Sequence, residues 1–298
     1  MGGPPPAGEG ATSRFGAPLG TDALIDAALA EDLGPGDVTS AWTVPESAEG
    51  RAEIVAKAGG VVSGLDVAEA VFLRVDPSLE VRAARAEGDS VTRGDRVLWV
   101  AGPLAAILGA ERTALNFLGR LSGIATSARR FVSELEGTGC RLLDTRKTTP
   151  GWRALEKRAA AAGGAVNHRA GLYDMVLIKE NHIRAAGGIR AALASTLTRA
   201  RLAGLEVEIE VTSLAELEEA LAGGPDRVLL DNMSVDELRA CVERTRAAPE
   251  PRPALEASGG VTLATARAVA ETGVDFVSVG AITHSAPALD LSLLVGAR

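Results

Sequence analysis

Charged residues and glycines follow a series of short apolar runs in the second half of this 298-residue chain. Six runs lead, in order, into Asp144-Thr145-Arg146-Lys147, Lys179, Glu210, Asp231, Ser258-Gly259-Gly260 and Val279-Gly280-Ala281. A stretch with helical spacing of apolar residues follows each run, which is the pattern of a β/α barrel built on parallel strands. The carboxyl ends of such strands face one pocket, so cations, two carboxylates and two glycine turns would meet there. This combination suits a ligand that carries phosphates, other anionic groups and a metal ion.

The basic residues near the first of these runs are candidates for anion binding. Arg146 and Lys147 precede Pro150-Gly151, which ends the strand and opens a helix whose N-terminal amides favour an anion. Asn167-His168-Arg169 adds an amide donor, a titratable imidazole and a guanidinium group that can bind a carboxylate through two hydrogen bonds. The alternatives are a surface turn for the basic pair and a structural role for the histidine.

The acidic and glycine-rich strand ends are candidates for binding ribose hydroxyls, a metal ion and a phosphate. Glu210 and Asp231 could hold ribose hydroxyls, or Mg²⁺ through water, because Mg²⁺ keeps several waters and takes few protein ligands. Ser258-Gly259-Gly260 and Gly280-Ala281 end the last two strands, where late barrel loops commonly cradle a phosphate through backbone N–H groups. Alternatively, the acids pair with the lysines and the glycines serve plain turns.

Composition narrows the class of protein. The net charge of −8 argues against a general nucleic-acid binder. Residues 141–184 nevertheless carry nine Lys/Arg and four Asp/Glu, so this segment has a charge of +5 and the rest of the chain has −13. A cationic segment in an acidic protein can attract small anions. No apolar run approaches the roughly 20 residues needed to span a bilayer. The two cysteines, Cys140 and Cys241, show no metal-ligand spacing, so we expect a reduced cytoplasm and no structural zinc. Residues 1–20 are rich in Gly and Pro, and we expect a mobile tail rather than a signal peptide.

The patterning predicts two architectures along the chain. The first half alternates over residues 51–99, which favours antiparallel strands, and then has helical spacing over 104–135 with a break near Ser122-Gly123. Short helices are expected at 22–30 and 67–74, with a turn-rich loop at 31–40 between the first of them and the strands. The barrel-like half begins near Gly139. Its helices are expected at 151–162, 188–202, 214–221, 235–245 and 263–271, with a seventh strand near 165–168 and a last strand or helix at 286–295.

Several stretches resemble the quinolinate phosphoribosyltransferase family, also named nicotinate-nucleotide pyrophosphorylase (carboxylating). They are residues 31–40, ERTALNFLGRLSGIAT from Glu111, LLDTRKTTPGWRALEK from Leu142 and NHRAGLYDMVLIKENHI from Asn167, followed by EIEV, VLLDN, EASGG and VSVGAITHSAPALDLSL. The resemblance covers nearly everything after the first twenty residues. One departure is Gly163-Gly164-Ala165, where the family usually carries three glycines; we expect little effect from one methyl group unless that position needs a positive φ.

The resemblance implies an α/β fold with an N-terminal α/β sandwich domain and a C-terminal open, seven-stranded β/α barrel. The implied division is a tail at 1–20, the sandwich at 21–138, the barrel at 139–285 and a segment at 286–298 that packs back on the sandwich. It also implies a homodimer, in some members a larger assembly, in which each barrel is covered by the partner subunit's N-terminal domain. Arg112 would then act in trans, although its position on a helix alone would make it a surface residue.

The implied activity is phosphoribosyl transfer from phosphoribosyl pyrophosphate (PRPP) to quinolinate, with loss of CO₂. By resemblance, Arg112, Arg146, His168 and Arg169 hold the two carboxylates of quinolinate, and Lys147 and Lys179 lie between the two substrates. Glu210 and Asp231 hold ribose hydroxyls and the Mg²⁺-pyrophosphate assembly, so these acids and the two lysines form the catalytic set. Ser258 to Gly260 and Val279 to Ala281 bind the 5′-phosphate, and Thr145 belongs to the substrate-binding set.

Two alternatives of different kinds remain at this point. One is a related pyrophosphorylase-like protein associated with molybdate transport, which shares the fold and many motifs. The other is a non-catalytic phosphate-binding protein on the same fold, because a fold alone does not determine function. The complete set of dicarboxylate-binding residues favours the quinolinate enzyme. We expect a cytoplasmic protein with no nucleic-acid or membrane partner.

Overall fold

The computed structural model describes residues 20–296, so the predicted tail at 1–20 lies outside the described residues except for Gly20. The described chain forms two compact units. The first, called here the barrel unit, consists of residues 171–261 and 268–277. The second, called here the N-terminal unit, consists of residues 20–170, 262–267 and 278–296. Both termini of the described chain therefore belong to the same unit.

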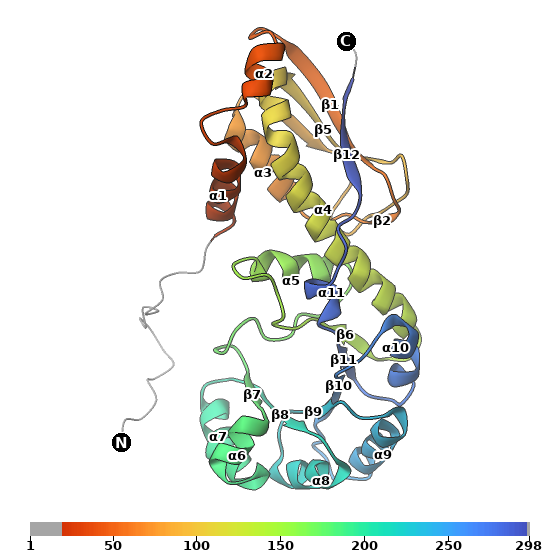
Figure 1. Cartoon of the computed structure of the whole chain (residues 1–298). Coiled ribbons are helices and arrows are strands. Elements are labelled where there is room, and N and C mark those ends of the chain that lie inside the picture. The colour runs from red at the N-terminus through yellow and green to blue at the C-terminus, as the bar shows by residue number, and fades with distance from the viewer. Residues whose placement is uncertain (1–19, 297–298) are drawn as a thin grey trace, which may run out of the picture. The chain divides into compact units, whose positions relative to one another are not determined.

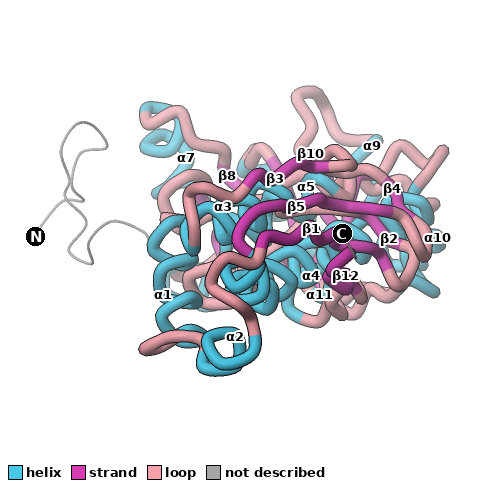
Figure 2. Tube along the Cα trace, turned by 90° about the horizontal axis from the view of Figure 1, so that it is seen from above, coloured by secondary structure: helices cyan, strands magenta, loops and turns pink. Residues whose placement is uncertain are grey.

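The N-terminal unit is built on an antiparallel sheet with the order β12-β1-β5-β3. Its strands are β1 (Glu49–Ala56), β3 (Glu80–Ala83), β5 (Arg96–Pro103) and β12 (Leu291–Gly296). Figure 2 shows β1, β5 and β3 side by side. In β1 every second residue from Ala52 is buried, and Ile54 lies opposite Leu98 on one side and Leu293 on the other. This alternation is the reason that one face of the sheet enters the core.

Helices cover the buried face of this sheet. They are α1 (Thr21–Leu33), α3 (Leu65–Val75) and the long α4 (Leu104–Leu135), and α4 contacts β1, β5 and β12 as well as α3. The short strands β2 (Gly60–Val61) and β4 (Ser90–Val91) pair with each other at one side. Figure 1 shows this layer of helices on the sheet, as expected of a sandwich domain.

The predicted loop at residues 31–40 is wrong at both ends, because α1 continues to Leu33 and a second helix begins at Val38. Helix α2 (Val38–Thr43) starts after Asp37, whose Oδ1 accepts hydrogen bonds from the backbone N–H groups of Thr39 at 3.0 Å and Ser40 at 3.1 Å. A carboxylate at this position satisfies N–H groups that have no partner within the helix. The hydrogen bonds from Ser40 also hold the pKa of Asp37 below its usual value.

The predicted break near Ser122-Gly123 is also wrong, because α4 runs unbroken through both residues. Gly123 is required by packing: a Cβ atom at this position would lie 2.0 Å from the carbonyl oxygen of Pro287. The segment before β12 therefore crosses α4 at very short range. A glycine that permits a close approach is easily mistaken for a helix breaker when only the sequence is read.

The parallel sheet has the strand order β6-β11-β10-β9-β8-β7, which confirms the α/β class and the barrel-type second half. Its strands are β6 (Arg141–Leu143), β7 (Val176–Ile178), β8 (Val207–Val211), β9 (Arg227–Asp231), β10 (Ala254–Ser258) and β11 (Phe276–Ser278). A seventh strand, predicted near residues 165–168, is present only as an isolated parallel bridge between Leu143 and Val166.

Helices alternate with these strands along the chain, as β/α units require. They are α5 (Arg153–Ala162), α6 (Glu180–Ala186), α7 (Ile189–Leu202), α8 (Leu214–Gly223), α9 (Val235–Arg246), α10 (Leu263–Ala270) and the short α11 (Ala281–His284). The central residues of β8, β9 and β10 are buried, as is typical of parallel strands covered on both faces, and they are apolar except for Glu208 and Glu256. No helix within residues 20–296 combines the length and the apolarity needed to cross a bilayer.

Two of the three glycines of α4 allow a prediction. Gly123→Ala should destabilise the protein by about 1–3 kcal/mol or more, because the added methyl group meets the backbone at Pro287 and Ala288. Gly109→Ala in the same helix should be neutral or stabilising by up to about 1 kcal/mol, since its Cβ would lie 3.5 Å from Leu33 Cδ2 and alanine favours a helix. Urea denaturation of both variants measures the difference, and equal stabilities would contradict the packing role of Gly123.

Candidate active site

Lys147 lies in the loop after β6, and its position is set by the segment after β11. The Oγ1 of Thr283 donates to the carbonyl oxygen of Lys147 at 2.8 Å, and the N–H of Val279 donates to Leu143 at 3.1 Å. A Cβ on Gly280 would lie 2.9 Å from Cδ of Lys147, so the aliphatic part of the lysine passes directly over this glycine. The fold thus brings together Lys147 and the Val279–Ala281 turn, which are more than 130 residues apart in the sequence.

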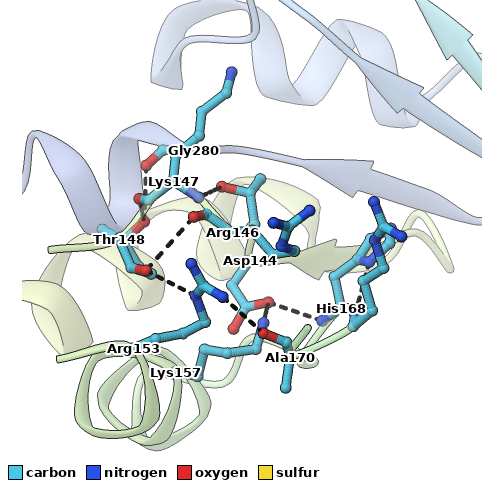
Figure 3. A network of polar contacts seen from close by, with 12 residues as sticks. Asp144, Arg146, Lys147, Thr148, Arg153, Lys157, His168, Ala170 and Gly280 are labelled. Atoms are coloured by element: carbon cyan, nitrogen blue, oxygen red, sulfur yellow. Dashed lines mark hydrogen bonds and ion pairs between the residues drawn. The ribbon is translucent and has the colours of Figure 1, made fainter. Parts of the chain in front are cut away.

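Asp144, at the start of the same loop, is the centre of a buried polar network (Figure 3). Its side chain is fully buried and forms an ion pair with Lys157 of α5, which is 5% exposed as a residue. Asp144 Oδ1 also accepts the backbone N–H of His168 at 2.8 Å. With the amide of Asn167 oriented so that both of its polar atoms have partners, its nitrogen donates to Asp144 Oδ2 at 2.7 Å. Both oxygens of this buried carboxylate are therefore satisfied.

Burial and neighbouring groups shift the pKa of the Asp144 carboxyl group in opposite directions. Burial raises the pKa of its carboxyl group above the ordinary value of 3.8, while the Lys157 ammonium and the N–H of His168 act in the opposite direction. A buried charge of this kind is tolerated only with a hydrogen-bonded partner of opposite charge. Lys157 therefore allows Asp144 to remain a carboxylate and so to accept the bond from His168.

His168 and Arg169 are held beside this network. The N–H of Arg169 donates to Nδ1 of His168 at 2.7 Å, so Nδ1 acts as an acceptor and leaves Nε2 as the ring nitrogen that can donate. Arg146 is half-buried, and its Nε is buried without a hydrogen-bond partner among the described residues. A buried donor of this kind is costly unless a ligand satisfies it. These features suit the binding of an anionic oxygen.

A second buried carboxylate fixes the outer part of the loop after β6. Glu156 is fully buried and accepts bonds from the N–H of Thr149 at 3.2 Å and from its Oγ1 at 2.8 Å. Its charge is balanced by Arg120 of α4 at 2.8 Å, and Arg120 also donates to the carbonyl of Thr283 at 2.7 Å. The Thr149 end of the Arg146–Thr149 segment is thus held by hydrogen bonds to a buried carboxylate. Thr145 contributes locally, because its Oγ1 accepts the N–H of Lys147 at 3.1 Å.

In the barrel unit, Lys179 and Glu210 form an ion pair. Lys179 Nζ lies 2.7 Å from Glu210 Oε2, and the glutamate side chain is only 15% exposed. The backbone N–H of Lys179 donates at 2.9 Å to Nδ1 of His182, the third residue of α6. The sequence analysis left open whether the strand-end acids simply pair with lysines. For Glu210 the pair exists in the structure, and the Lys179 side chain is about half exposed.

In the same unit, Asp231 at the end of β9 lies beside the segment that follows β10. Asn232 Nδ2 donates to Asp231 Oδ2 at 2.7 Å, and the N–H of Asn232 donates to the carbonyl of Ser258 at 2.8 Å. A Cβ on Gly259 would lie 2.2 Å from the side-chain oxygen of Asn232, and Gly259 and Gly260 both have positive φ. Only glycine fits this close approach, which leaves the backbone after Ser258 exposed.

The structure thus sorts the predicted site residues into two groups. The N-terminal unit holds Thr145, Arg146, Lys147, His168, Arg169 and Val279–Ala281, and the barrel unit holds Lys179, Glu210, Asp231 and Ser258–Gly260. Arg112 stands apart: it is exposed on α4, eight residues or about 12 Å along the helix from Arg120. Within residues 20–296 it makes no hydrogen bond or ion pair.

The sequence analysis missed the buried residues that support the first group. It used Asp144 only as part of a strand tip and assigned no role to Glu156, Lys157 or Arg120. One signal was available: Glu156 and Lys157 lie between the apolar residues Leu155, Ala159 and Ala160 of a short helix. Charges amid an apolar stripe are a hint of buried ion pairs, although the sequence does not show their partners.

Comparison with known proteins identifies the family of this chain. The family model for the C-terminal domain of quinolinate phosphoribosyl transferase matches residues 124–294, and the model for its N-terminal domain matches residues 37–122. This chain belongs to the quinolinate phosphoribosyltransferase family. The resemblance stated from the sequence motifs is confirmed.

Individual members of the family agree with this assignment. A probable nicotinate-nucleotide pyrophosphorylase (carboxylating) of Synechocystis sp. is 45% identical over 90% of both chains, and its counterpart from Bacillus subtilis is 41% identical over 91% of both. The structure of the nicotinate-nucleotide pyrophosphorylase from Francisella tularensis superposes with a TM-score of 0.85, at 38% identity, and covers 93% of this chain and 98% of its own. Nearly the whole chain is therefore shared with these relatives.

The Asp144–Lys157 pair allows a pH-dependent prediction. Lys157→Met should destabilise the protein by about 3–5 kcal/mol near pH 7.5, because the buried carboxylate loses its counter-charge. Without Lys157, the pKa of Asp144 is raised further by burial, so the folded state binds the proton more tightly than the unfolded chain does. The variant's stability should therefore be greatest at acid pH and be lost as the pH rises above the ordinary aspartate pKa.

Denaturation by urea at pH 5 and pH 7.5 measures this difference against the wild type. The control is Arg158→Met on the same helix, whose exposed ion pair with Asp66 should contribute less than about 1 kcal/mol at either pH. A second control is Asp144→Asn/Lys157→Met, in which the pH-dependent difference should disappear. A pH-independent loss in Lys157→Met alone would refute the assignment of the charge to Asp144.

Proposed function

We propose that this chain transfers the phosphoribosyl group of PRPP to the ring nitrogen of quinolinate and releases CO₂ and pyrophosphate, forming nicotinate mononucleotide. Family membership supports the reaction, and the N-terminal unit supports the choice of acceptor. The observation that carries it is the half-buried Arg146, with an unpaired buried Nε, in a network that also fixes His168 and Arg169. Three cationic or donor groups held together in this way suit an acid with two carboxylates.

The predicted site residues would bind different parts of the two substrates. Arg146, His168 and Arg169 would bind the quinolinate carboxylates. The Ser258–Gly260 and Val279–Ala281 turns would bind the 5′-phosphate through backbone N–H groups. Glu210 and Asp231 would bind ribose hydroxyls, and Lys147 and Lys179 would neutralise negative charge that grows on the departing pyrophosphate.

The reaction needs positioning and charge stabilisation more than it needs a protein nucleophile. As pyrophosphate leaves, positive charge grows on the anomeric carbon and the pyridine nitrogen attacks it. The product ring is a pyridinium, which stabilises the carbanion left at ring carbon 2 when the adjacent carboxylate leaves as CO₂. We expect the protein to hold the two reactants in line and to exclude competing water.

Glu210 and Asp231 fit the magnesium ion that accompanies PRPP. Both are carboxylates at the carboxyl ends of neighbouring strands, and hard oxygen ligands are those that Mg²⁺ prefers. Glu210 is already paired with Lys179, so contact through water or through the pyrophosphate suits it better than direct ligation. When bound, the ion would supply further neutralisation of the leaving group.

We also propose a homodimer in which Arg112 acts on the partner subunit's substrate. Arg112 is exposed, makes no hydrogen bond or ion pair within residues 20–296 and lies about two helical turns along α4 from Arg120, which supports the basic loop. A two-fold dimer would supply it to two equivalent sites. Whether larger assemblies form, and whether the protein is cytoplasmic, remain predictions.

The alternative readings have less support. The relatives named above are nicotinate-nucleotide pyrophosphorylases, and none of their names refers to molybdate transport. A non-catalytic phosphate-binding protein would be expected to lack one of the predicted cations or acids, and all of them are present. Of these readings, the quinolinate enzyme alone uses the complete set of residues.

The first activity prediction concerns the reaction itself. The purified protein should release CO₂ and pyrophosphate from quinolinate, PRPP and Mg²⁺. Nicotinate, which has one carboxylate, should be a very poor substrate because charged donors would remain unpaired. Lys147→Ala should lower kcat by about 10²-fold or more while the protein stays folded, since a preorganised charge is removed. Comparable kcat/KM for nicotinate and quinolinate would refute the dicarboxylate role.

The second activity prediction concerns Arg112. Arg112→Ala and Lys147→Ala should each be nearly inactive alone. After subunit exchange in an equal mixture, about half of the dimers should be mixed and about a quarter of all sites should have both residues intact. Mass spectrometry of differently labelled subunits confirms the exchange, and a turnover assay measures recovery. Confirmed exchange without recovered activity would show that Arg112 acts in its own chain or not at all.

A further inference from the structure

Two loops of the N-terminal unit carry its cationic groups, and helix α5 lies between them in the sequence. The first loop follows β6 and contains Arg146 and Lys147, and the second contains His168 and Arg169. Near their bases the loops are joined by the parallel bridge between Leu143 and Val166. Further out, the spacing of their side chains depends on other contacts.

Arg153, the first residue of α5, contacts both loops with one guanidinium group. Its Nε donates to Thr148 Oγ1 at 3.0 Å, and its Nη1 donates to the carbonyl oxygen of Ala170 at 3.1 Å. Figure 3 shows Arg153 between these two partners. Because the guanidinium is planar and rigid, two hydrogen bonds in fixed directions also fix the distance between the two loops.

Lys157 repeats this connection one helical turn later. It pairs with Asp144 of the first loop, and the same carboxylate oxygen accepts the N–H of His168 in the second. Residues four apart in a helix lie on the same face, so Arg153 and Lys157 form one row directed at both loops. We call these two residues the α5 clamp.

We infer that the α5 clamp is a positioning device that sets the spacing between Arg146 and the His168-Arg169 pair, and thereby the recognition of a dicarboxylate. The inference rests on the proposed function and extends it to residues that contact no substrate. The carboxylates of a rigid aromatic diacid are a fixed distance apart, so the groups that bind them must also keep a fixed distance. A misplacement of about 1 Å can lower the rate by about 10²-fold.

The effect should fall on quinolinate more than on PRPP. Lys147 is held independently, by Thr283 at its carbonyl oxygen and by Gly280 beneath its side chain. Loss of the clamp would therefore free the Ala170 end of the second loop relative to the first, while Lys147 and the Val279–Ala281 turn keep their places. A role in general stability would instead change the kinetics for both substrates alike.

The experiment compares four variants by steady-state kinetics with each substrate varied in turn. Arg153→Met removes both hydrogen bonds and keeps most of the side-chain volume. Thr148→Val removes the hydroxyl group, which accepts the Arg153 bond at 3.0 Å and donates a longer bond of 3.5 Å to the carbonyl oxygen of Arg146, and Thr148→Ser retains it. Arg158→Met is the matched control, because Arg158 lies on the same helix but pairs with Asp66 at 2.7 Å and contacts neither loop.

We expect Arg153→Met and Thr148→Val to raise the KM for quinolinate by about tenfold or more, with the KM for PRPP changed by less than about twofold. Thr148→Ser and Arg158→Met should resemble the wild type. If Arg153→Met does not fold, Thr148→Val decides the question. Unchanged KM values in a folded Thr148→Val or Arg153→Met, or equal changes for both substrates, would overturn the inference. Absence of turnover in the wild type would instead refute the proposed function, and the clamp with it.

Discussion

The buried ion pair between Asp144 and Lys157 is the interaction on which the cationic site of the N-terminal unit depends. A carboxylate with no exposed surface would ordinarily take up a proton, and burial does raise the pKa of Asp144. The ammonium of Lys157 opposes this and keeps a charged acceptor in place for the N–H of His168. A neutral residue at either position would leave a buried charge without a partner, which is among the most costly defects in a protein interior. The position of the loop at residues 167–169 therefore depends on Lys157 of α5.

Glu156 and Arg120 extend the same principle to the outer part of the site. Their ion pair joins α5 to α4, and each partner also binds the backbone or hydroxyl of a loop, at Thr149 and at Thr283. The long helix α4 consequently serves as the common support for the antiparallel sheet and for the basic loop. Its glycines at 119 and 123 let the segment before β12 approach closely, so the chain can return to β1 without displacing the helix.

Charge around the predicted site residues is arranged differently in the barrel unit. Lys179 and Glu210 are already paired at 2.7 Å, and the lysine is about half exposed. A partly exposed pair of this kind contributes little to stability and can exchange partners when an anion or a cation arrives. Beside the basic loop, the N-terminal unit instead has the buried carboxylates of Asp144 and Glu156 paired with Lys157 and Arg120, and Arg146 Nε is buried without a hydrogen-bond partner among the described residues. We interpret the first arrangement as one that responds to a ligand and the second as one that is preorganised for it.

The sequence by itself determined the fold class, the family and most residues proposed to contact ligands, because these features are local: apolar runs of strand length, charged or glycine-rich strand ends, and helices between them. It also misjudged local signals with a tertiary cause. Gly123 looked like a helix break, yet it accommodates Pro287, and the loop before residue 40 ends in a helix because Asp37 satisfies its first N–H groups. Only the tertiary structure placed Gly280 under Lys147 and paired Asp144 with Lys157, since burial and long-range contacts decide which charges meet. Residue types and spacing suggested which groups could do chemistry, whereas the buried ion pairs that hold those groups in place became visible only in the folded chain.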